Sequence, residues 1–305
     1  MRARKMGLNI ALLIFVIVTW GYSWVLMKIG LRFMGPLTFA TWRCLLGGLA
    51  MIPVLYMKGV PWPPRGRLFD YAAVGFFQTT AMFGFILYGM RFVTAGKTAV
   101  LLYTMPIWTS FLVHFYLKER LTAQRWLGVV IGTVGILCIL GWDTLVKQNL
   151  KILLGEFLVI VAAVSWAVAN IWVKKRMIRE DSYMVNGLQM LIGSVGLALI
   201  SLPTEGLLNV TWTWLSVGVI LFTGIVASTI NFTIWFYLLR KLDIHTATFS
   251  SMLVPVFGLL FDWLQLGNRL DTGVIIGGIL ILVGIYQISN QKSPPRPRVW
   301  SVSRR

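Results

Sequence analysis

Residues 150–173 read LKILLGEFLVIVAAVSWAVANIWV, a stretch in which only Lys151 and Glu156 carry charge. It is close to the ~20 residues that an α-helix needs to cross the hydrocarbon core of a bilayer. Lipid offers no hydrogen-bond partner, so the backbone N–H and C=O groups of such a segment must be paired within it. The stretch therefore predicts a transmembrane helix.

Nine further stretches of the chain have the same character. The ten predicted spans cover residues 7–27, 36–57, 68–90, 95–117, 124–141, 150–173, 183–203, 212–238, 245–266 and 271–290. The connecting segments are short and contain turn residues such as Gly35-Pro36 and Pro63-Pro64. We therefore expect an all-α integral membrane protein.

The composition excludes an ordinary soluble domain. Of the 305 residues, 57% are hydrophobic and 12% are charged, whereas a soluble domain has about 25% charged residues. The net charge is +18, and 20 of the 28 Lys and Arg residues fall in segments on the same side as the N-terminus. The positive-inside rule then predicts that both termini are cytoplasmic. These cations are spread over six segments, so no basic domain remains for nucleic acid and no such partner is expected.

An internal duplication relates the first five spans to the last five. Each half has an odd number of spans, so the second half must enter the membrane upside down, as in secondary transporters that bind solute where inverted repeats meet. We expect one repeat at residues 1–146, a second at 147–290, a central cavity between them, and a disordered basic cytoplasmic tail at 291–305. The matched pairs include Trp20/Trp166 and Gly47/Gly193 at an offset of 146, and Gly75/Gly224, Thr80/Thr229 and Pro106/Pro255 at an offset of 149.

These features resemble the EamA-type branch of the drug/metabolite transporter superfamily. The resemblance rests on the ten spans, the duplication, the Trp of spans one and six, and the Pro of spans four and nine, followed by KERLT at 118–122 and GNRLD at 267–271. It implies an inner-membrane permease, usually an exporter of amino acids or related metabolites. Asn268 stands opposite Glu119, so a role that needs both carboxylates is not expected.

Polar and aromatic side chains deep in the spans are the candidates for solute binding, with hydrogen bonding between helices as the competing role. Helical spacing groups them into stripes on single helix faces. Stacking surfaces with a few hydrogen-bonding groups suit a small amphipathic solute. The predicted substrate-binding residues are Trp20, Ser23, Gln78, Thr79, Met82, Tyr103, Trp166, Asn170, Ser228, Asn231, Trp235 and Ser251.

Pro106 and Pro255 remove a backbone donor at the same place in both halves, which predicts either a hinge or a fixed kink. Arg43, Glu156 and Asp262 lie nearer the span ends, so no midplane acid is expected to carry protons, and facilitated diffusion or exchange is favoured. For Arg43 we weigh pairing with a carboxylate of a neighbouring span against contact with an anionic group of the solute, and pairing is favoured.

The sequence gives little support to an enzyme or a channel. Two His and two Cys are too few for a His/Cys metal site, catalytic motifs are missing, and no acidic ring suggests a channel. We expect no cofactor. The prediction is a permease of the bacterial cytoplasmic membrane that exports amino acids or similar neutral or zwitterionic metabolites, as a monomer or homodimer in the bilayer. A carrier for drugs or nucleotide sugars is the alternative.

Overall fold

The computed structural model describes residues 2–117, 122–140, 149–239 and 253–289, and within these ranges the chain is helical without a β-strand. The first part forms α1 (Arg2–Gly30), α2 (Pro36–Met57), the 3-10 turn η1 (Arg65–Arg67), α3 (Leu68–Val74), the π-helix η2 (Gly75–Ala81), α4 (Met82–Gly89), α5 (Ala95–Leu102), α6 (Met105–Leu117) and α7 (Ala123–Leu140). The second part forms α9 (Leu150–Arg176), α10 (Ser182–Thr204), α11 (Trp214–Leu221), the π-helix η3 (Phe222–Ile230), α12 (Asn231–Leu239), α14 (Leu253–Leu266) and α15 (Thr272–Ser289).

Seven of the predicted spans are confirmed as helical segments long and apolar enough to cross a membrane. The other three predicted spans correspond to shorter apolar helices at Ala123–Ile139, Leu253–Leu266 and Thr272–Ile288. Residues 245–252 of the ninth predicted span lie outside the described residues. Large apolar side chains such as Leu199 and Ile279 remain exposed on the outer surface, as expected for helices that face lipid tails rather than water.

Short polar residues begin several of these helices. The side chain of Asp181 accepts hydrogen bonds from the backbone N–H groups of Tyr183 and Met184 at the start of α10, and Thr213 forms a capping box with Ser216 at the start of α11. Each cap satisfies N–H groups that have no partner inside the helix. The helix boundaries are therefore encoded locally.

Two predicted spans are interrupted by π-helical segments. The spans at 68–90 and 212–238 each contain one, η2 and η3, which lie at corresponding places in the two halves. In η3 the hydroxyl of Ser228 donates to the carbonyl oxygen of Thr223 at 2.8 Å. The prediction of helical spans did not distinguish π-helical from α-helical turns, because one extra residue in a turn only shifts the phase of an apolar pattern. π-Helical turns are frequent at functional sites.

The span predicted at 95–117 is also not continuous. Tyr103 and Thr104 separate α5 from α6, and Pro106 lies in the first turn of α6, where its missing N–H costs no hydrogen bond. Pro255 is the third described residue of α14, and the residues before Leu253 lie outside the described ranges. Pro106 therefore occupies a helix start, and the role of both prolines as hinges stays a prediction.

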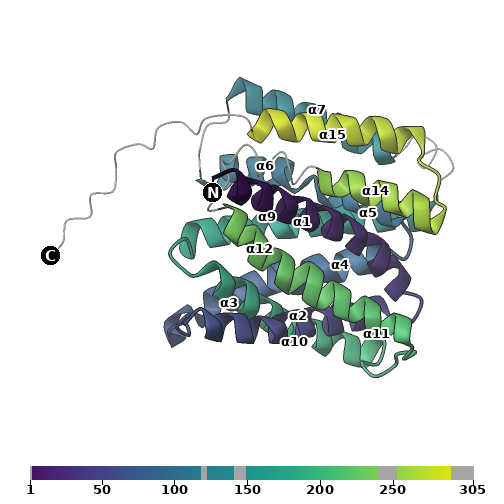
Figure 1. Ribbon diagram of the computed structural model, residues 1–305. Helices are drawn as coiled ribbons and strands as arrows, with labels where there is room; N and C mark the ends of the chain where they lie inside the picture. The colour runs from purple at the N-terminus through teal and green to yellow at the C-terminus, as the bar shows by residue number, and fades with distance from the viewer. Residues whose placement is uncertain (1, 118–121, 141–148, 240–252, 290–305) are drawn as a thin grey trace.

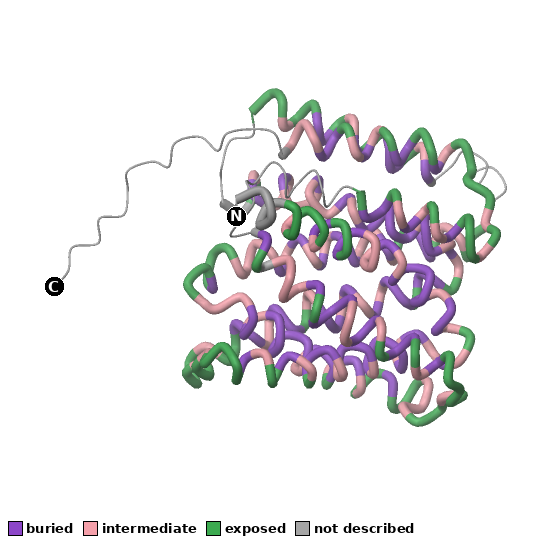
Figure 2. Tube along the Cα trace, viewed as in Figure 1, coloured by how far each residue is buried: buried purple, intermediate pink, exposed green. Residues whose placement is uncertain are grey.

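Helices from the two halves of the chain pack in pairs. Figure 1 shows α7 beside α15 at one side of the bundle and α2 beside α10 at the opposite side. A Cβ atom on Gly128 would lie 2.6 Å from the carbonyl oxygen of Gly284, and one on Gly277 would lie 2.5 Å from that of Gly135. Small residues thus let the backbones of α7 and α15 approach closely. The buried residues gather between the layers of helices (Figure 2).

Candidate functional site

A cavity of about 300 Å³ lies inside the bundle, among residues from both halves of the chain. This volume is at the lower end of the range of ~300–1,000 Å³ for small-molecule sites. The wall is mostly aromatic and apolar. It is formed by Trp20, Ser23, Trp24, Met27, Arg43, Gln78, Met82, Phe83, Leu102, Tyr103, Met105, Pro106, Trp166, Gln189, Met190, Ala227, Phe232, Trp235, Val254 and Ile285.

The cavity brings together seven of the predicted substrate-binding residues, namely Trp20, Ser23, Gln78, Met82, Tyr103, Trp166 and Trp235. The Trp20 ring lies 5.6 Å from the Trp235 ring, and its indole N–H donates to the carbonyl oxygen of Ala227 at 2.7 Å. Tyr103 and Trp166 meet edge to face with 6.5 Å between ring centroids. Indole and phenol rings held in this way offer fixed surfaces for stacking.

Four other predicted residues lie away from the cavity wall. Thr79 donates to the side-chain oxygen of Gln189 at 2.5 Å, and Ser228 bonds within η3. Asn231 is fully buried and exchanges hydrogen bonds with the Thr19 hydroxyl, and the Asn170 amide donates to the sulfur of Met105 at 3.3 Å. The contacts of Thr79, Asn170 and Asn231 join helices, which is the competing role for polar residues in spans, whereas that of Ser228 stays within its own helix. Ser251 lies outside the described residues.

Gln189 and Arg43 are the polar wall residues that the set of predicted binding residues omits. Gln189 is the seventh residue of the span predicted at 183–203, about as far from the span end as Arg43 is in its own span, so depth in the span does not single it out. Arg43 is charged, but counting residues from the start of its predicted span places it nearer the span end than the middle of the membrane. Arg43 is the one residue of α2 among the described lining residues, so its side chain alone brings this helix to the cavity.

Arg43 is 5% exposed, and its guanidinium lies 4.3 Å from the centroid of the Phe83 ring. One of its N–H groups donates to the sulfur of Met27, and its Nε is buried without a hydrogen-bond partner. None of the ion pairs among the described residues involves Arg43. The favoured expectation that Arg43 pairs with a carboxylate of a neighbouring span is therefore wrong for the part of the chain that the structure covers.

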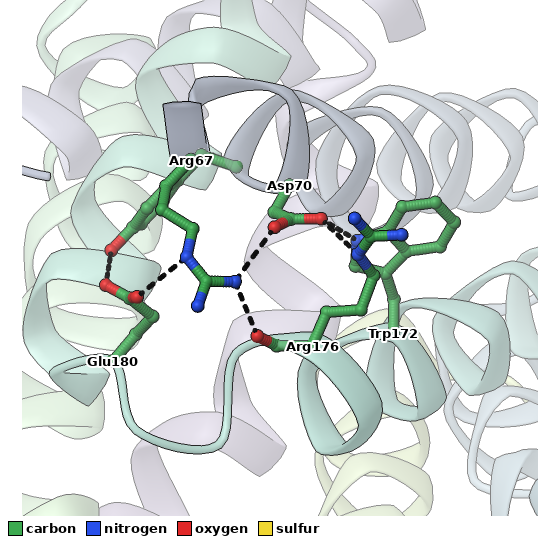
Figure 3. Close-up of polar contacts among 6 residues, drawn as sticks. Arg67, Asp70, Trp172, Arg176 and Glu180 are labelled. Carbon is green, nitrogen blue, oxygen red and sulfur yellow. Dashed lines mark hydrogen bonds and ion pairs between the residues drawn. The ribbon is translucent and has the colours of Figure 1, made fainter. Parts of the chain in front are cut away.

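Beyond the cavity, at the end of the bundle where α3 begins, charged residues join the two halves. We refer to Arg67, Asp70, Tyr71, Trp172, Arg176 and Glu180 as the Asp70 network. Asp70 accepts from Arg176 at 2.8 Å, from the Trp172 indole at 3.1 Å and from Arg67 at 3.3 Å (Figure 3). Arg67 also lies 3.7 Å from Glu180, which accepts a hydrogen bond from Tyr71 at 2.8 Å.

A second set of contacts between the halves lies at the end of the bundle where α5 begins. We refer to Gly96, Lys97, Glu156, Asp262 and Asn268 as the Glu156 network. Glu156 has no exposed surface and forms an ion pair with Lys97. Asp262 accepts from the backbone N–H of Gly96 at 3.0 Å and from the Asn268 amide at 2.9 Å. Glu156 and Arg176 both belong to α9, so the two networks are about 30 Å apart along this helix.

The described residues hold no cluster of three or more His, Cys, Asp or Glu side chains that could bind a metal ion. The described residues that form the cavity wall include no carboxylate. Its polar groups are amides, hydroxyls, indole N–H groups and one guanidinium. This set can bind a small solute by stacking, hydrogen bonding and one ionic contact.

Comparison with known proteins gives the family of the chain. The EamA-like transporter family matches twice, over residues 7–141 and 153–290. A solved crystal structure of a protein with 17% sequence identity superposes with a TM-score of 0.63, covering 92% of this chain and 97% of the other. That likeness supports the fold alone.

Curated relatives are also transporters. The uncharacterized transporter YoaV of Bacillus subtilis is 34% identical over 90% of this chain and 94% of its own length. A protein of Salmonella typhimurium named "Probable amino-acid metabolite efflux pump" is 30% identical over 90% of this chain and 92% of its length, and one of Escherichia coli with the same name is 29% identical over 93% and 94%. The chain therefore belongs to the EamA-like transporter family and is a membrane transporter rather than an enzyme.

Proposed function

We propose that this transporter exports amino acids or related small zwitterionic metabolites by alternating access. The observation that carries the proposal is the cavity between the halves. Its described wall residues join aromatic surfaces to amide, hydroxyl and guanidinium groups, with no carboxylate among them. Such a wall matches a solute with an apolar body and a polar head group. The printed names of the Salmonella and Escherichia relatives point to the same class of solute.

The proposed architecture is ten membrane-spanning segments arranged as two inverted repeats of five. Related hydrogen bonds in the two halves support it: Thr80 donates to the carbonyl oxygen of Gly193 at 2.9 Å, and Thr229 donates to that of Gly47 at 2.8 Å. The sequence offsets match these two donors to each other and likewise the two acceptors. The paired π-helices and the two successive family matches agree with this arrangement. Two halves related in this way provide two equivalent conformations that open to opposite sides.

The proposed location is the cytoplasmic membrane of a bacterium, with both termini in the cytoplasm. The distribution of Lys and Arg supports this orientation. Lys58 follows α2 on the proposed inner side, and Lys151 lies at the start of α9 on the proposed outer side; both are exposed. In intact cells, a membrane-impermeant thiol reagent should label Lys151→Cys and not Lys58→Cys in a background with Cys44 and Cys138 replaced. The opposite labelling pattern would reverse the orientation.

Counterflow in liposomes tests the transport claim. Vesicles that contain purified protein and unlabelled amino acid should accumulate the labelled form of at least one amino acid without a pH gradient. The absence of a carboxylate from the cavity wall is the reason to expect exchange without protons. Failure with every amino acid would refute the solute class. Exchange that requires a gradient would refute uncoupled transport.

A matched pair of substitutions tests whether the cavity is the site. Trp166 lines the cavity, whereas Asn231 joins α12 to α1 through Thr19. We expect Trp166→Ala to lower the counterflow rate at least about fivefold with little change in thermal stability, because loss of a stacking surface costs about 1 kcal/mol. Asn231→Ala should mainly lower stability, because it removes the hydrogen bonds between α12 and α1, although the Thr19 hydroxyl keeps the carbonyl oxygen of Phe15 as an acceptor. Equal counterflow by wild type and Trp166→Ala would argue against this cavity.

A further inference from the structure

The guanidinium of Arg43 is a buried positive charge on the wall of the central cavity. It has five N–H donors in a planar fork. The described contacts occupy it weakly, because a thioether sulfur is a poor acceptor, an aromatic ring offers only its π face, and Nε has no partner. A cation removed from water without a counter-charge is destabilised unless something else supplies one.

Carboxylates within the described chain do not supply that charge. Asp70 and Glu180 belong to the Asp70 network, and Glu156 pairs with Lys97. Glu205 accepts from the N–H and hydroxyl of Thr38 at the start of α2. Asp262 likewise accepts from Gly96 and Asn268. Among the described residues no acidic group pairs with Arg43, which leaves a solute in the cavity as a source of the counter-charge.

The chemistry around Arg43 selects a single carboxylate. A planar guanidinium binds a carboxylate through two parallel hydrogen bonds, which a neutral amide cannot match in strength. Arg43 is the one cation among the described residues of the cavity wall, so a group with several negative charges would bring more charge than these residues neutralise. The amide of Gln78 and the rings of Trp20 and Tyr103 share the wall and can receive the rest of a zwitterionic solute. An ammonium group is attracted to such ring faces.

We propose that Arg43 binds the carboxylate of the transported solute, so that this carrier selects monocarboxylates with an apolar or aromatic body over the corresponding neutral amides and amines. This assignment rests on the proposed function and adds to it the residue that recognises the solute head group. Stacking on Phe83 and the Met27 contact hold the guanidinium in place for this role.

Ligand binding to purified protein tests the assignment without requiring transport. Thermal stabilisation in detergent would be measured with L-phenylalanine against L-phenylalaninamide, and with phenylacetate against phenylacetamide, together with other L-amino acids and their carboxamides. A ligand that binds the folded protein raises the unfolding temperature by an amount that grows with the logarithm of the ratio of ligand concentration to Kd, so a concentration series gives the relative affinities. Wild type should bind at least one acid roughly tenfold or more tightly than its amide, because a charge-assisted pair is lost in the amide.

Variants separate recognition from packing. Arg43→Gln should weaken acid binding roughly tenfold or more and leave amide binding within about twofold, and Arg43→Lys should be intermediate because it keeps the charge without the fork. Arg91→Gln is the matched control, since Arg91 also lies over an aromatic ring, that of Tyr88, but outside the cavity. It should bind acids as the wild type does.

Three outcomes would overturn the assignment: equal affinity of the wild type for every acid and its amide, equal loss of acid and amide binding in Arg43→Gln, or acid binding by Arg43→Gln as tight as that of the wild type. Counterflow separates this result from the proposed function. If phenylacetate binding depends on Arg43 but no amino acid is exchanged, the carboxylate site stands and the amino-acid claim fails. If amino acids are exchanged without dependence on Arg43, the amino-acid claim stands and the carboxylate site fails.

Discussion

The two ends of the helix bundle join the halves of the chain by different means. In the Asp70 network the arginine side chains are half exposed, 43% for Arg67 and 53% for Arg176. In the Glu156 network the carboxylate is wholly buried and the Lys97 side chain is 13% exposed. One end is a network whose cations reach water, and the other contains an ion pair withdrawn from it.

This difference sets the cost of separating the halves at each end. In the Asp70 network the carboxylate of Asp70 is only 4% exposed, but its arginine partners reach water, so water and salt compensate for part of a lost contact. Fully exposed pairs contribute about 0–1 kcal/mol. Breaking a buried pair leaves an uncompensated charge and costs about 3–5 kcal/mol. In a carrier that opens to each side in turn, we therefore expect the Asp70 end to open at lower cost than the Glu156 end.

The largest expected effect is on the buried pair. Lys97→Met leaves Glu156 unpaired, so the free energy of unfolding in detergent should fall by about 3–5 kcal/mol. The double variant Lys97→Met with Glu156→Leu should recover most of this loss, because no buried charge remains. Lys151→Met removes an exposed lysine of the same helix end and should have little effect. A Lys97→Met variant as stable as the wild type would remove the distinction between the ends.

A smaller effect is expected for the Asp70 network. Asp70→Asn weakens the acceptor of three donors, yet Arg67 and Arg176 can turn to water, so the loss of stability should be about 1–3 kcal/mol. Asp181→Asn is the matched control, because Asn caps a helix as well as Asp does while the same charge is removed. Unfolding of both variants in denaturant measures the difference. A loss larger than that of Lys97→Met would reverse the order of the two ends.

The smallest effect is the dependence on salt. At 1 M salt the screening length falls to about 3 Å, which weakens exposed pairs more than buried ones. The coupling energy between Arg176 and Asp70, from a double-mutant cycle, should fall below about 0.5 kcal/mol, while that between Lys97 and Glu156 should change less. Equal salt dependence of both couplings would show that the two networks are equally solvated.

The sequence predicts most of the helices and much of the cavity, because apolar length and helical spacing are local properties. Trp20 and Ser23, or Gln78 and Met82, share a helix face at fixed spacing, and that face lines the cavity. Spacing does not reveal which polar groups bond to one another across helices. From spacing alone Asn231 looks like a cavity residue, and only its hydrogen bond to Thr19 across the helices shows that it joins α12 to α1.

The depth of a residue in the bundle and the breaks within a predicted span are harder to predict. Counting residues from the end of a span assumes a straight helix perpendicular to the membrane. Arg43 lies seven residues after Pro36, so counting places it near the span end, although its side chain lines the cavity. The break at Tyr103 and Thr104 was signalled by Pro106, but its extent depends on how α5 and α6 pack. The π-helices have no periodic signature of their own, since each adds a single residue to an apolar run.

The most direct test of alternating access measures both ends at once by distances between spin labels in a background without cysteine. Arg65→Cys with Arg179→Cys would span the Asp70 end, and Arg91→Cys with Gln265→Cys the Glu156 end; all four residues are exposed. Addition of a transported solute should lengthen the distance at one end while shortening it at the other. Distances that remain fixed, or that lengthen at both ends together, would contradict alternating access.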